Sequence, residues 1–221
     1  DGLGDRLNEY YELGARFTKW RAVISISDDL PSKNCIRLNA HALARYAALC
    51  QQAKMVPIVE PEVLMDGSHD IDRCFDVTSE VLQEVFAELN NQKVALNGIV
   101  LKPNMVISGM DATNRADIPT VASATVKCLS ENVPNQVPGI AFLSGGQTSE
   151  EATGHLNAMN EMGPHPWQLT FSYGRALQAE PLNVWSGEDE NIPAAQESFI
   201  KRSRLNSLAR TGNYHPQMEE A

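Results

Sequence analysis

The feature that most constrains the fold is a repeated alternation between short apolar runs and longer amphipathic stretches. The runs are rich in Val, Ile and Leu, end at polar or charged residues, and lie at positions 20–26, 56–59, 98–101, 140–143 and 169–171. Helical periodicity occupies positions 40–52, 70–89, 194–209 and a stretch from 149 onwards. This alternation is typical of βα units around a buried parallel sheet, so we predict an α/β fold.

The count of these units falls short of a closed barrel. Five βα units are visible, whereas a (β/α)8 or TIM barrel has eight. Two interpretations stay open at this point, an open sheet or a barrel whose first strands lie upstream. No repeat, low-complexity tract or long linker divides the chain, so we expect one domain over residues 1–221, with a flexible tail at 212–221.

Composition excludes several classes of partner. The 221 residues are 43% hydrophobic, which is typical of a globular protein, and carry a formal net charge of −10. This charge argues against nucleic acid and membrane surfaces as partners, and an anionic substrate would need a local cluster of cations. The four cysteines stand far apart and no metal-ligand spacing occurs, so we expect reduced thiols, a cytoplasmic protein, no metal and no cofactor.

Lys102 directly follows the run at 98–101, and Pro103 follows the lysine. A lysine at the exit of a buried strand is partly desolvated, and desolvation favours the neutral amine that attacks a carbonyl to form a Schiff base. The alternative is an exposed lysine that caps a strand, as most lysines are exposed.

Two pairs of charged residues lie at the start of the first run and directly after the second. In an extended chain Lys19 and Arg21 project to one face, as do Glu60 and Glu62, because side chains alternate along a strand. Adjacent cations favour a shared anion such as phosphate, and paired carboxylates are typical of general acid–base chemistry. A solvated strand start and a charged loop edge are the alternatives.

Two glycine-containing loops follow the fourth and fifth runs and predict a phosphate site. Glycine permits close approach of the backbone, an arginine binds phosphate through two parallel hydrogen bonds, and a helix start adds N–H donors. The residues that we expect to bind the phosphate are Ser144, Gly145, Gly146, Ser172, Gly174 and Arg175. Barrel enzymes often build a phosphate site from their last two such loops, although a single Ser-Gly-Gly is usually only a turn.

The combination resembles class I fructose-bisphosphate aldolases over nearly the whole chain. The shared phrases are Lys19-Trp20-Arg21, Pro57-Ile58-Val59-Glu60-Pro61-Glu62, Leu101-Lys102-Pro103-Asn104-Met105, Phe142-Leu143-Ser144-Gly145-Gly146-Gln147 and Phe171-Ser172-Tyr173-Gly174-Arg175-Ala176-Leu177. The resemblance implies the C-terminal portion of a TIM barrel, with about the last five βα units in this chain. Three strands that include a further pocket aspartate would lie upstream.

The resemblance also implies the roles of individual residues. Lys102 would form the Schiff base, Glu60 would act as general acid–base, Glu62 would tune its neighbours, and Lys19 and Arg21 would contact the substrate. The implied reaction is metal-independent, reversible cleavage of fructose 1,6-bisphosphate to dihydroxyacetone phosphate and glyceraldehyde 3-phosphate, in glycolysis and gluconeogenesis. The implied assembly is a cytoplasmic homotetramer.

Other readings remain beside this one. The chain could be a non-catalytic fragment that keeps only phosphate binding, or another Schiff-base barrel lyase. Without the upstream strands we expect the 221 residues alone to be inactive, because two sheet edges would be open and part of the pocket absent.

Overall fold

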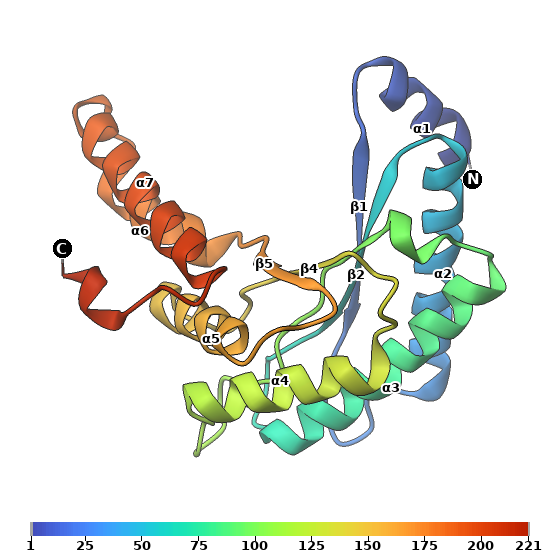
Figure 1. The fold of residues 1–221 in the computed structure, drawn as a ribbon, viewed down its shortest axis with the longest axis horizontal. Helices are drawn as coiled ribbons and strands as arrows, with labels where there is room; N and C mark the ends of the chain where they lie inside the picture. Colours follow the sequence, from blue (N-terminus) through green and yellow to red (C-terminus); the bar gives the residue numbers. More distant parts are fainter. Residues whose placement is uncertain (1, 221) are drawn as a thin grey trace.

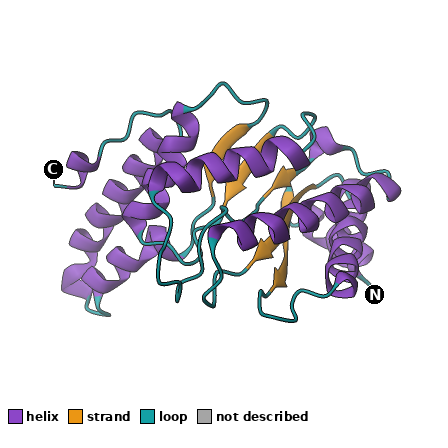
Figure 2. Ribbon diagram, turned by 90° about the horizontal axis from the view of Figure 1, so that it is seen from below, coloured by secondary structure: helices purple, strands orange, loops and turns teal. Residues whose placement is uncertain are grey.

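The computed structural model describes residues 2–220 and contains one sheet of five parallel strands, seen pointing the same way in Figure 2. The strands are β1 (Phe17–Ile24), β2 (Val56–Val63), β3 (Val100–Leu101), β4 (Gly139–Phe142) and β5 (Gln168–Phe171). Their spatial order is their order in the chain, β1-β2-β3-β4-β5. A doubly wound sheet would reverse its order at a switch point, so this order is that of an arc of a barrel wall.

Helices form the outer layer of this arc. They are α1 (Leu3–Glu12), α2 (Lys33–Gln52), α3 (Ile71–Asn91), α4 (Ile118–Asn132), α5 (Ser149–Glu161), α6 (Arg175–Trp185) and α7 (Ile192–Ala209). Each helix from α2 to α6 contacts the next, and Figure 1 shows α2, α3, α4 and α5 following one another around the sheet. The loops after the strands therefore meet at one end, where barrel enzymes place their sites.

All five strands overlap the apolar runs that predicted them, with bounds that differ by up to four residues. β1 begins at Phe17, and β2 continues to Val63. Glu60 and Glu62 are therefore strand residues and not residues of the following loop. An apolar run does not predict this extension, because the inward carboxylates become tolerable only when cations on β1 lie beside them.

Three helices, α1, α4 and α6, were not predicted, and α2 begins earlier than expected. The start of α2 is set by Ser32, whose hydroxyl accepts a hydrogen bond from the Cys35 N–H at 3.1 Å. In α4 the buried face includes Ala122 and Thr125, so its hydrophobic periodicity is weak.

Part of the expected tail at 212–221 packs against the domain. Tyr214 is buried and its N–H donates to Asn157 Oδ1 of α5 at 2.9 Å. Arg202 of α7 binds both carboxylate oxygens of Glu219 at 2.8 Å, and this arginine is itself buried. These contacts argue against a flexible tail between Tyr214 and Glu219.

Candidate functional site

The charged pairs of β1 and β2 meet on the face of the sheet opposite α2. Lys19 Nζ lies 3.1 Å from Glu60 Oε2, and Arg21 Nε forms an ion pair with Glu62 Oε2. Trp20, between the two cations, points to the other face and packs on the ring of Tyr46, with centroids 5.5 Å apart. The alternation predicted for this strand is therefore confirmed.

Glu60 is the central carboxylate of the cluster. It is only 3% exposed, and its two oxygens face two amines, Lys19 Nζ at 3.1 Å and Lys102 Nζ at 3.2 Å. Within residues 2–220 its Oε2 accepts no hydrogen bond, so the contact with Lys19 is an ion pair without hydrogen-bond geometry. A buried carboxylate with free acceptor capacity, in contact with two amines, is suited to proton transfer.

Lys102 is fixed at the exit of β3 by its backbone. Its N–H donates to Val59 O of β2 at 2.8 Å, and the next carbonyl, of Pro103, accepts the Leu143 N–H at 3.2 Å. The lysine is thus held between β2 and β4, and it is 9% exposed. Burial with one carboxylate partner is the environment expected of an amine nucleophile.

Asn104 also fixes the exit of β3, through hydrogen bonds to β2 and α3. Its Oδ1 accepts the Val63 N–H at 3.0 Å and its Nδ2 donates to Thr78 Oγ1 of α3 at 3.1 Å. The asparagine is buried, and it links the ends of β2 and β3 to the helix layer. The chain around Lys102 is therefore restrained on three sides.

The loop after β4 is a tight turn with free donors. Gln147 N–H donates to Ser144 O at 3.2 Å, which closes the turn, while the N–H groups of Gly145 and Gly146 have no acceptor within residues 2–220. Gly146 has φ +72°, and a Cβ there would lie 2.2 Å from Met65 Cγ. Glycine is required at this position because a side chain would meet both strain and a clash.

The two helices that follow these loops differ as anion sites. At α5, Thr148 and Glu151 form a reciprocal capping box, and Glu150 adds a second carboxylate to the first turn. At α6 the N-cap residue is Gly174, so no side chain caps the helix, and the first turn contains no acidic residue. The free N–H groups at α6 therefore favour an anion, whereas the carboxylates at α5 disfavour one.

All of the predicted site residues line one cavity of about 550 Å³. They are Lys19, Arg21, Glu60, Glu62, Lys102, Ser144, Gly145, Gly146, Ser172, Gly174 and Arg175. Five strands contribute to this lining, either directly or through the loops that follow them. The structure brings together every residue that the sequence nominated.

The cavity lining also contains residues that the sequence analysis did not nominate, among them Arg115 and Gln147. Arg115 comes from the long loop before α4, donates to Gly146 O at 3.1 Å and lies 3.5 Å from Glu151 Oε1. No local pattern marks Arg115, because it lies in a loop outside every predicted strand and helix. Gln147 stood inside a nominated motif, and its amide side chain was the available signal.

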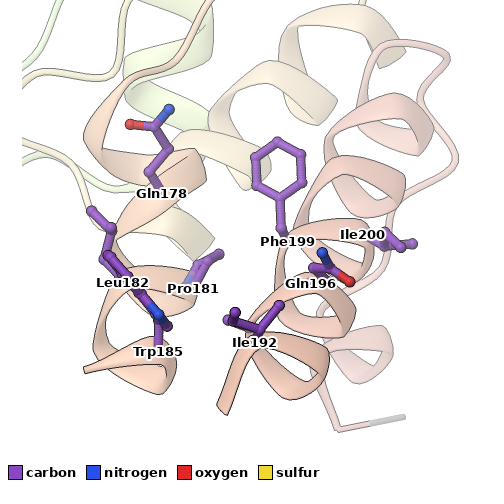
Figure 3. Close-up of a pocket in the computed structure, with 9 residues that line it drawn as sticks. Gln178, Pro181, Leu182, Trp185, Ile192, Gln196, Phe199 and Ile200 are labelled. Atoms are coloured by element: carbon purple, nitrogen blue, oxygen red, sulfur yellow. The ribbon is translucent and has the colours of Figure 1, made fainter. Parts of the chain in front are cut away.

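A second hollow, between α6 and α7, is of another kind (Figure 3). Figure 3 shows Leu182, Pro181 and Trp185 of α6 facing Ile192 and Phe199 of α7. No charged side chain lines this apolar groove. It is therefore unsuited to a phosphorylated ligand, and the polar cavity is the candidate active site.

Metal ligands, membrane-spanning helices and disulfides are three further features that the sequence analysis addressed. Among residues 2–220 no group of three or more His, Cys, Asp or Glu side chains could hold a metal ion. No helix in that range is long and apolar enough to cross a membrane. The four cysteines are free thiols, and burial raises the pKa of Cys128 to about 11.

Comparison with known proteins decides the family. The family model for class-I fructose-bisphosphate aldolase matches residues 1–221. This chain belongs to the class-I fructose-bisphosphate aldolase family. A probable fructose-bisphosphate aldolase class 1 from Xanthomonas axonopodis pv. citri is 54% identical over 215 residues, and the cytosolic fructose-bisphosphate aldolase 4 of Arabidopsis thaliana is 52% identical over 215 residues.

The family's fold agrees with the strand order described above. Fructose-bisphosphate aldolase from Plasmodium falciparum, solved with TRAP and a small-molecule inhibitor, superposes with a TM-score of 0.95 at 50% identity. The match covers 97% of this chain and 62% of that aldolase chain. The five βα units are thus part of a (β/α)8 aldolase barrel.

The chain spans only part of its relatives. Each alignment covers 97% of this chain, but 64% of the Xanthomonas protein and 55% of the Arabidopsis protein.

Proposed function

We propose that the full-length protein is a fructose-bisphosphate aldolase that cleaves fructose 1,6-bisphosphate through a Schiff base on Lys102. The observation that carries this proposal is the contact of Lys102 and Lys19 with the buried carboxylate of Glu60. One amine can attack a carbonyl while the carboxylate moves protons and the second amine balances its charge.

The proposed chemistry needs no redox partner. Lys102 Nζ adds to the C2 carbonyl, and loss of water from the carbinolamine, assisted by Glu60, gives an iminium ion. The C3–C4 bond then breaks, its electron pair enters the iminium to form an enamine, and the C4 hydroxyl proton passes to a base. Release of glyceraldehyde 3-phosphate is followed by protonation at C3 and hydrolysis, which frees dihydroxyacetone phosphate and the amine.

We assign the phosphate on the dihydroxyacetone half to the loops after β4 and β5. The free N–H groups of Gly145 and Gly146, the uncapped start of α6 and the cation of Arg175 support this assignment. Lys19 and Arg21, half exposed at the rim, would contact the rest of the sugar phosphate. Glu62 would keep Arg21 in place.

Replacement of Arg175 by Ala should weaken binding of phosphorylated substrate. A charge-assisted hydrogen bond contributes about 1.5–3 kcal/mol, so KM should rise roughly ten- to a hundredfold. The measurement is steady-state cleavage of fructose 1,6-bisphosphate by the full-length protein. Arg210→Ala, an exposed arginine outside the cavity, is the matched control. An unchanged KM for the Arg175 variant would remove this residue from the phosphate site.

Chelation should leave cleavage intact, because the iminium ion already serves as the electron sink. The test compares initial rates before and after dialysis against EDTA. Activity that is lost and then restored by zinc would contradict the Schiff-base assignment and point to Lewis-acid chemistry.

We also propose a cytoplasmic homotetramer that acts in glycolysis and gluconeogenesis. The name of the Arabidopsis relative, a cytosolic aldolase, supports the location. The tetramer rests on the resemblance described above, and light scattering of the full-length protein would test it.

A further inference from the structure

The turn that is assigned to phosphate has a buried support behind it. His155, in the second turn of α5, is 4% exposed, and its Nδ1 lies 2.7 Å from Gln147 Oε1. Gln147 closes the turn through its own N–H and is 9% exposed. The pair therefore ties the end of the phosphate loop to the interior of α5.

The chemistry of the pair fixes the protonation of the imidazole. An amide oxygen only accepts hydrogen bonds, so Nδ1 of His155 carries the hydrogen and donates it. Burial lowers the pKa of His155 to about 4; nearby Glu151 raises this pKa and Arg115 lowers it. The ring is thus neutral at pH 7 and does not bring a positive charge to the loop.

Because His155 is bonded to the Gln147 amide oxygen, the amide nitrogen remains available as a donor. Within residues 2–220 this Nε2 is buried and has no hydrogen-bond partner. A buried, unsatisfied donor is destabilising, and none of residues 2–220 supplies its acceptor. Since Gln147 lines the same cavity as Gly145 and Gly146, a bound ligand is the available source of an acceptor.

We propose that His155 is a positioning residue that holds the Gln147 amide so that Nε2 donates to the substrate phosphate in the Ser144–Gln147 turn. The proposal rests on the proposed function and adds a specific donor to it. His155 itself does not touch the ligand. Its effect reaches the phosphate only through the orientation of the amide.

Two amide replacements of His155 separate this role from simple packing. Asn places an N–H where the imidazole has Nδ1, so His155→Asn can still donate to Gln147. Gln places its amide near the position of Nε2, so His155→Gln cannot donate in the same way. Gln147→Leu removes the proposed donor while keeping a similar volume.

In the full-length protein, His155→Gln and Gln147→Leu should each raise KM for fructose 1,6-bisphosphate about tenfold, with kcat nearly unchanged, because a hydrogen bond to a charged phosphate is lost. The dissociation constant for inorganic phosphate, followed by phosphorus NMR, should rise by a similar factor. His155→Asn should remain within about twofold of the unmodified protein. The double variant His155→Gln/Gln147→Leu should bind phosphate with about the same dissociation constant as each single variant, because both changes remove the same hydrogen bond.

A spectroscopic measurement on the unmodified protein tests the proposal without variants, so a folding defect in a variant cannot affect it. Nitrogen-15 NMR of His155 at pH 7 should show a neutral ring with the hydrogen on Nδ1. A hydrogen on Nε2, equal phosphate affinity in all variants, or equal weakening by the Asn and Gln replacements would overturn the proposal.

Different results would refute the aldolase function and the positioning role of His155. A full-length protein that binds phosphate through Gln147 but does not cleave the bisphosphate would refute the aldolase proposal and leave this inference standing. A protein that cleaves the sugar with the KM unaffected by His155→Gln would refute this inference alone.

Discussion

Lys102→Met should abolish cleavage of fructose 1,6-bisphosphate by the full-length protein. Without the amine there is no iminium ion to accept the electron pair of the breaking bond, and kcat should fall by roughly 10⁴- to 10⁶-fold, the scale seen when a covalent nucleophile is removed. Met keeps the length of the side chain, so the cavity should stay intact. Inorganic phosphate should bind as before.

Trapping chemistry locates the reactive amine directly. Borohydride reduction in the presence of dihydroxyacetone phosphate should add mass to the peptide that contains Lys102, and the Met variant should take up none. Lys127→Met, on the exposed face of α4, is the matched control and should keep both activity and adduct. An adduct on Lys19 would show that the other amine beside Glu60 is the nucleophile.

Glu60→Gln should lower kcat by about 10²- to 10⁴-fold, the usual contribution of a general acid–base. The amide keeps the shape of the carboxylate but cannot exchange a proton with Lys102 or with the carbinolamine. Single-turnover trapping should show slow imine formation, while KM changes less than kcat. Thermal unfolding of the variant would report any cost of leaving two amines without their shared counter-ion.

Glu62→Gln provides the comparison for this variant. Its carboxylate pairs with Arg21, and within residues 2–220 it forms no ion pair with Lys102, so a smaller loss is expected. If Glu60→Gln keeps kcat within about threefold of the unmodified enzyme, Glu60 is not the acid–base group.

The sequence by itself determined the class of fold and which residues would gather at one site. In parallel βα units the ends of the strands meet at one edge, so residues such as Lys102, Ser144 and Arg175 could be grouped before their distances were known. This rule depends only on local pattern and strand direction. It grouped the residues that follow β3, β4 and β5 correctly, and the nominated residues within β1 and β2 line the same cavity.

Tertiary structure decided which partner each group has. Glu60 lies in the middle of β2 because Lys19 of the neighbouring strand compensates its burial, and hydrophobic periodicity does not contain that information. The same holds for the contact of Arg115 with the Ser144–Gln147 turn and for the support of Gln147 by His155. Such contacts join segments that only packing brings together, so the sequence nominated the residues of the site and the fold decided which of them are paired.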